Sequence, residues 1–163
     1  MRRRLFISGF LFVAVPSLVW AAPAPSHALP DSKLTPGMSD PAVTQANLQT
    51  TICVSGYTAT VRPPSSYTDK IKSGQLNDPK YRYRDHVMAD YEEDHLIPLE
   101  LGGHPTDPKN LWPELYAGVN GARVKDQLED RLKRLVCSGM VTLQEAQTAI
   151  AANWIAAYRK YVH

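Results

Sequence analysis

The chain has 163 residues and carries 18 Lys and Arg against 16 Asp and Glu, a formal net charge of +2. A hydrophobic fraction of 44% and a charged fraction of 21% are typical of a soluble globular protein and exclude a collagen-like repeat, a wholly disordered chain and a polytopic membrane protein. The length suits one domain, and a charge near zero excludes a histone-like polycation, so any contact with nucleic acid must be local.

Residues 1–21 have the pattern of a secretory signal peptide. Three arginines at positions 2–4 precede an apolar run over residues 5–20, and cleavage is expected after Ala21. The alternative is a membrane anchor, but the run is short for a span of about 20 residues and Pro16 interrupts it. We therefore expect a bacterial protein that is periplasmic or secreted and has no stable association with the membrane. Cleavage would remove three of the 18 basic residues and no acid, which leaves 15 against 16 and a net charge of −1.

Residues 22–37 contain four prolines among small and polar residues, so this segment is predicted to be a flexible, exposed arm. Residues 38–163 are predicted to form the folded domain. Within it we expect a short helix from Asp40 to about Gln49, a strand over residues 50–60 and a second short helix over residues 65–76.

Cys53 and Cys137 are the only cysteines of the chain. In a secreted protein such a pair usually forms a disulfide, although two free buried thiols are the alternative. Without a CxxC motif, the pair does not indicate a zinc site.

Apolar residues at positions 124, 128, 132, 135 and 136 recur at steps of three and four, which predicts a helix with one buried face. Gly139 suits the end of this helix, and Thr142 with Glu145 forms a capping box for a second one. The C-terminal third should therefore be an antiparallel helical hairpin.

The segment from Asp85 to Glu100 holds six acidic residues and neither Lys nor Arg. A solvated acidic face is the simplest explanation. However, Asp94 and His95 directly precede an apolar stretch, and a Gly-Gly turn and Asn110 follow. A neutral histidine can take a proton from water near pH 7, and carboxylate and amide oxygens suit a hard divalent cation. These residue types are common, so composition alone does not select them.

The stretch YEEDHLIPLELGG, followed by NLWP at residues 110–113, resembles the HNH endonucleases of the ββα-metal (His-Me finger) superfamily. The resemblance implies an α+β fold in which a ββα-metal finger, with its motif in residues 91–125, is flanked by helices that include the C-terminal hairpin and is braced by one disulfide. It also implies roles for six residues: Asp94 and Asn120 as metal ligands, His95 as the general base, Asn110 as the residue that orients His95, and Lys125 and Arg123 as phosphate contacts.

The resemblance has departures and open points. No pair of CxxC motifs for a structural zinc is present, and asparagine at the third motif position favours Mg²⁺ or Mn²⁺ over Zn²⁺. Asn120 could instead cap the long helix, and Asn110 could belong to a turn. Because strand neighbours point to opposite faces, the chain must bend at Asp94 and His95 for both to serve one site.

The sequence thus predicts a secreted, monomeric, metal-dependent endonuclease that hydrolyses DNA, with RNA as a second candidate substrate. The alternative is a catalytically silent, disulfide-braced binding module, which a net charge of −1 would suit because nonspecific nucleases present basic surface to DNA. A glycan hydrolase with paired carboxylates is a weaker third hypothesis, because nothing selects the pair.

Overall fold

The computed structural model describes residues 28–163, so the predicted signal peptide lies outside the described residues. The described chain combines helices with a small antiparallel sheet of two strands, which confirms the α+β class. The α-helices and strands are α1 (Tyr57–Val61), α2 (Ser65–Asn77), β1 (Tyr91–His95), β2 (Leu111–Leu115), α3 (Ala122–Cys137) and α4 (Leu143–Tyr161). Short 3-10 helices are η1 (Gln45–Thr50), η2 (Pro79–Tyr81), η3 (Met88–Asp90), η4 (Leu99–Leu101) and η5 (Pro108–Asn110).

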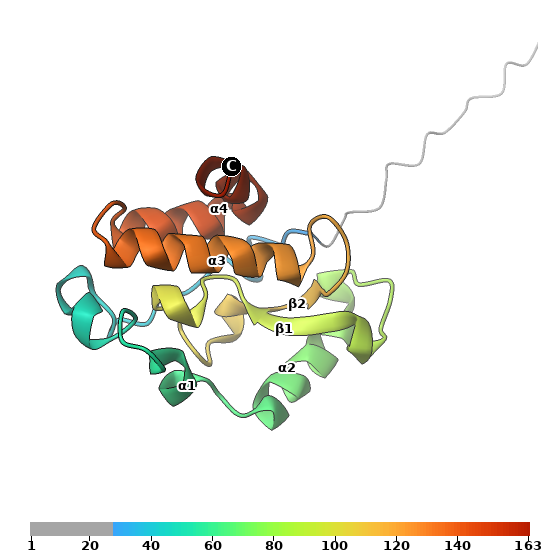
Figure 1. Ribbon diagram of the computed structural model, residues 1–163. Helices are drawn as coiled ribbons and strands as arrows, with labels where there is room; N and C mark the ends of the chain where they lie inside the picture. Colours follow the sequence, from blue (N-terminus) through green and yellow to red (C-terminus); the bar gives the residue numbers. More distant parts are fainter. Residues whose placement is uncertain (1–27) are drawn as a thin grey trace, which may run out of the picture.

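The sheet lies between α2 on one side and the α3–α4 pair on the other (Figure 1). In its register Glu92 lies opposite Glu114, and Asp94 lies opposite Trp112. Residues that face each other across two strands project to the same side of the sheet, so these four share one face. Lys125 of α3 bonds Asp94, and this face is therefore the one toward α3.

Both strands form against their own sequence preferences, because acids are poor strand residues and Pro113 removes a backbone donor. Helix α2 supplies the missing support: Lys72 donates to the Tyr91 carbonyl at 3.0 Å, and Gln75 donates to the Leu111 carbonyl at 2.9 Å. Pro113 is tolerated because each strand of a two-stranded sheet has a free edge. Tertiary contacts therefore override local propensity here.

The predicted C-terminal helical hairpin is confirmed by α3 and α4, which pack against each other. Their facing side chains are fully buried, among them Leu128, Leu132 and Trp154. Gly139 has a φ of +76° just after α3, and Thr142 accepts a hydrogen bond from the Glu145 amide at the start of α4. Capping signals read from the sequence thus place both helix ends.

The predicted disulfide between Cys53 and Cys137 is also confirmed, and it ties the end of α3 to the segment between η1 and α1. The strand expected over residues 50–60 is wrong. The Cys53 amide bonds back to the Leu48 carbonyl at 3.0 Å, and Gly56, with a φ of +82°, then turns the chain into α1. Local turns satisfy this backbone, so it needs no neighbouring strand.

The helix expected from Asp40 to about Gln49 is shorter than predicted. It forms only as the 3-10 helix η1, which begins at Gln45. The helix expected over residues 65–76 is confirmed as α2.

The described part of the segment predicted as an exposed arm, residues 28–37, makes contacts with the domain. Thr35 is only 1% exposed, and the Gly37 amide donates to the Lys109 carbonyl at 3.0 Å. The Ala28 carbonyl accepts a hydrogen bond from the Trp154 indole at 2.8 Å. These contacts hold residues 28–37 against the domain despite their proline content. Within residues 28–163, no helix is long and apolar enough to cross a membrane.

Candidate active site

The loop after β1 is held together by the side chain of Asn110, which is fully buried. Its amide oxygen accepts hydrogen bonds from the Ile97 and Met38 amides, at 3.0 and 3.2 Å. Its amide nitrogen donates to the carbonyls of Ile97 and His104, at 2.9 and 3.1 Å. Three of these bonds fix the backbone of residues 97–104, and the fourth ties Met38 to the same side chain.

The Gly-Gly turn allows this loop to close. A Cβ atom on Gly103 would lie 1.7 Å from the Ile97 carbonyl oxygen and 2.9 Å from the Asn110 amide nitrogen. Gly102 has a φ of +70°, a conformation that L side chains rarely adopt. The two glycines thus let the backbone pass directly over Asn110.

His95 ends β1, and its side chain is oriented by the loop that Asn110 holds. Its Nε2 lies 2.9 Å from the Pro105 carbonyl oxygen. A carbonyl can only accept, so Nε2 donates and the neutral ring keeps an unprotonated Nδ1. Burial lowers the pKa of His95 below its ordinary value, against the opposing effects of the Pro105 carbonyl and Asp94. The imidazole is thus a neutral base near pH 7.

Asp94 has both carboxylate oxygens engaged. Oδ1 accepts from the His95 amide at 2.7 Å, and Oδ2 accepts from the Lys125 ammonium at 2.5 Å. Burial alone would raise the pKa of Asp94, but the positive charge of Lys125 outweighs it and holds the pKa below its ordinary value. Asp94 is therefore ionised at neutral pH.

Behind this pair lie two further acids that burial makes harder to ionise. Burial raises the pKa of Glu114 to about 10 and that of Glu129 to about 8. Asp94 and Lys125 form an ion pair within this cluster. A paired charge can exist in a protein interior, where an unpaired charge could not.

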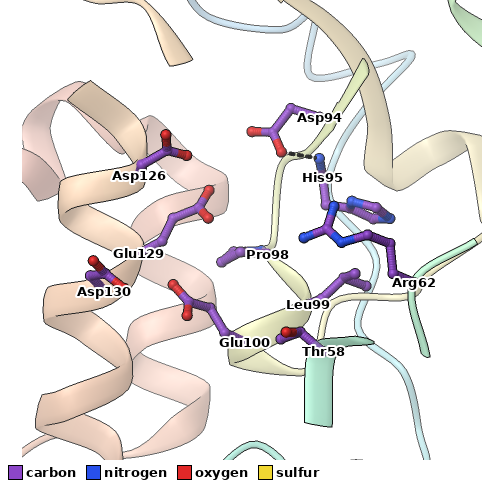
Figure 2. Close-up of a pocket in the computed structure, with 10 residues that line it drawn as sticks. All are labelled: Thr58, Arg62, Asp94, His95, Pro98, Leu99, Glu100, Asp126, Glu129 and Asp130. Carbon is purple, nitrogen blue, oxygen red and sulfur yellow. Dashed lines mark hydrogen bonds between the residues drawn. The ribbon is translucent and has the colours of Figure 1, made fainter. Parts of the chain in front are cut away.

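A cavity of about 220 Å³ opens beside Asp94 and His95 (Figure 2). Five carboxyl groups line it, and Arg62 is the only Lys or Arg among the described residues that do so. Figure 2 shows the acids of α3 facing Asp94 across the cavity, with the Arg62 guanidinium beside the His95 ring. The lining residues are Thr58, Arg62, Asp94, His95, Pro98, Leu99, Glu100, Asp126, Glu129 and Asp130.

The structure brings together some of the predicted site residues and separates others. Asp94 and His95 both line the cavity, because β1 ends at His95 and the chain turns there. Asn120 precedes Gly121, the N-cap of α3, and it is outside the cavity lining. Arg123 is exposed on the first turn of α3 and is also outside the lining.

Two predicted contacts differ from the structure. Asn110 was expected to orient His95 directly, but its bonds go to loop backbone and the ring is held by Pro105. Lys125 was expected to touch a phosphate, but its side chain has no exposed surface because it pairs with Asp94 and Glu129 inside the protein.

Sequence reasoning missed Arg62 and Glu129. Arg62 forms the C-cap of α1 and is followed by two prolines, which separate α1 from α2 and set where its side chain starts. It lies 32 residues before Asp94 in the chain, and no local pattern marks it. Glu129 follows Lys125 by four residues, a spacing that usually indicates an ordinary helical ion pair.

The donor set around Asp94 suits a hard divalent ion in its chemistry but not in its present arrangement. The oxygens belong to the side chains of Asp94 and Glu129 and to the His95 carbonyl. Mg²⁺ and Mn²⁺ prefer such oxygen ligands to the softer sulfur ligands. All three currently bind the Lys125 ammonium. Within the described residues, no group of three or more His, Cys, Asp or Glu side chains is arranged to hold a metal ion.

Comparison with known proteins gave no match among family models, curated proteins or solved structures. Assignment to the HNH family therefore rests on the motif and remains a prediction.

Proposed function

We propose that this chain is a secreted HNH-type endonuclease that hydrolyses phosphodiester bonds of DNA, with His95 as the general base. The observation that carries the proposal is the His95 imidazole, which is held at Nε2 by the Pro105 carbonyl and lines a cavity shared with Arg62. A fixed neutral histidine beside a guanidinium suits the attack of water on an anionic ester. The chain order of β1, β2 and α3 supports a ββα-metal finger as the scaffold.

In the proposed reaction, Nδ1 of His95 accepts a proton from the attacking water. Its lowered pKa keeps the ring unprotonated at neutral pH, as a base requires. Arg62 binds a non-bridging phosphate oxygen and draws the scissile group toward His95, because a guanidinium pairs well with phosphate. Asp94 bonds the His95 amide and thereby fixes the backbone from which the imidazole extends.

We further propose that the reaction depends on Mg²⁺ or Mn²⁺, held by Asp94, Glu129 and the His95 carbonyl. Such an ion, when bound, would stabilise the charge on the phosphate and on the leaving oxygen. Asn120 stays a candidate ligand only if the chain before α3 moves toward Asp94.

The test is plasmid nicking by protein purified after expression of the full chain for export, with Mg²⁺ or Mn²⁺ present. Wild-type protein should nick supercoiled DNA, and His95→Ala should lose activity by about 10²- to 10⁴-fold, because a general base contributes that much. His86→Ala is the matched control, since His86 is exposed and lies outside the cavity. Equal nicking by wild type and His95→Ala would refute the proposal.

A second candidate is a binding module without catalytic activity. The engagement of both Asp94 oxygens by protein donors favours it, because the position of a metal ligand is already filled. Such a module would show neither nicking nor a rise in melting temperature with Mg²⁺ or Mn²⁺.

A further inference from the structure

The Lys125 ammonium lies in a cradle of three oxygens that belongs to the candidate active site. It donates to Asp94 Oδ2 at 2.5 Å and to the His95 carbonyl at 2.9 Å, and it also bonds Glu129 Oε1. The side chain is 0% exposed, so water does not share these contacts. Three acceptors match the three N–H donors of an ammonium group, and the cation is fully coordinated by the protein.

These acceptors come from separate parts of the fold. Asp94 and His95 belong to the end of β1, and Glu129 lies one turn beyond Lys125 on α3. One ammonium therefore joins the strand to the helix at the position where the proposed chemistry takes place.

The same three oxygens are the ones that a divalent ion at Asp94 would use, since carboxylate and carbonyl oxygens are its preferred ligands. An ammonium and a divalent cation cannot share one buried carboxylate oxygen without strong repulsion between them. Either cation therefore excludes the other from the cradle.

We propose that the Lys125 ammonium is the resident cation of the Asp94 site, and that a divalent ion binds there only by displacing it. The inference rests on the proposed function only in taking Asp94 as the metal position. Lys125 is then a positioning residue that holds Asp94 and the His95 carbonyl in place when no ion is bound.

The proposal predicts a specific penalty on metal affinity. The apparent affinity for an ion falls by the fraction of molecules in which Lys125 has left the cradle. Minor conformations of this kind hold about 0.1–10% of molecules, so removal of the competing ammonium should tighten binding by about 10- to 1000-fold.

The experiment is a Mn²⁺ titration without substrate, followed by electron paramagnetic resonance, on wild type and Lys125→Met. Methionine has a similar length and no charge. The variant should bind Mn²⁺ at least about 10-fold more tightly than wild type, and Asp94→Asn in the same variant should abolish the gain. Lys160→Met is the matched control, because Lys160 is exposed on α4 and lies outside the cradle. It should bind Mn²⁺ as wild type does.

Equal Mn²⁺ affinity in wild type and Lys125→Met would overturn the proposal. If Lys125→Met does not fold, wild-type protein with ¹⁵N-labelled lysine decides the question. Displacement is supported if the protected Lys125 ammonium signal persists without Mg²⁺ and then falls in proportion to the fraction of protein that has bound Mg²⁺. A signal that persists while no Mg²⁺ binds also supports Lys125 as the resident cation. Absence of a protected signal, or an unchanged signal while Mg²⁺ saturates the site, overturns it. These readouts need no catalysis, so an inactive protein would still give a clear answer.

Discussion

Asn110 acts on His95 through the backbone, although the two side chains share no hydrogen bond. Its amide group holds the carbonyl of His104, and the next residue, Pro105, supplies the carbonyl that orients the imidazole. The residue to which the motif resemblance gives the role of orienting the histidine thus acts on it indirectly, through the loop backbone. An amide suits this position, because the backbone around it presents both donors and acceptors.

Replacement of Asn110 by alanine should reduce the free energy of unfolding by about 2–4 kcal/mol, because several buried backbone groups lose their partners. Urea denaturation measures the change. Asn77→Ala is the control: Asn77 makes an exposed bond to the Ser73 carbonyl, and its loss should change stability by less than about 0.5 kcal/mol. Equal effects of the two substitutions would contradict the role given to Asn110.

The resemblance to the HNH motif predicted roles for Asp94, His95 and Asn110, which lie within 17 consecutive residues of the chain. Arg62 could not be found in this way, since only the packing of α1 beside the cavity brings it to His95. The burial of Lys125 was equally hidden. A lysine between Val124 and Asp126 looks like part of a solvated face until Asp94 is known to lie opposite it.

At the scale of elements, helices were predictable where their apolar stripes and caps are local, as in α3 and α4. The segment around Cys53 was not. Its β-branched residues favour a strand, but Gly56 and the bond from Cys53 to Leu48 turn the chain instead. The contacts of residues 28–37 could not be predicted for a related reason, because their partners, Lys109 and Trp154, are remote in sequence.

The loop between β1 and β2 can be tested by replacing Gly103, with Gly74 of α2 as the control. Gly103→Ala should unfold the loop or the domain, since the new Cβ would meet backbone at 1.7 Å. Gly74→Ala should instead stabilise the protein by about 0.5–1 kcal/mol, because Gly74 lies in α2 with open space around it and alanine is the better helix former. Thermal unfolding of both variants checks this, and a stable, unperturbed Gly103→Ala protein would contradict the description of the loop.

At the scale of the whole molecule, charge is distributed unfavourably for a nonspecific nuclease. The cavity carries five carboxyl groups, and its cations are the exposed Arg62 on its wall and the internal Lys125. Loss of residues 1–21 would also remove three arginines and leave a net charge of −1. The net charge of +2 of the full chain therefore does not predict how the domain binds DNA. Near His95, basic side chains are available to pair with only one or two phosphates.

This charge distribution predicts a weak dependence of DNA binding on salt. Each neutralised phosphate contributes about −0.9 to the slope of log K against log salt concentration, so Arg62, with Arg123 at the edge, should give a slope of about −0.9 to −1.8. Fluorescence anisotropy with labelled duplex and the His95→Ala protein, which binds without cutting, measures it. Arg62→Gln should make the slope less steep by about 0.9, and Arg159→Gln, on the last turn of α4, should leave it unchanged. A slope steeper than about −4 would mean that a basic surface elsewhere binds the DNA, and that this cavity does not receive the phosphate.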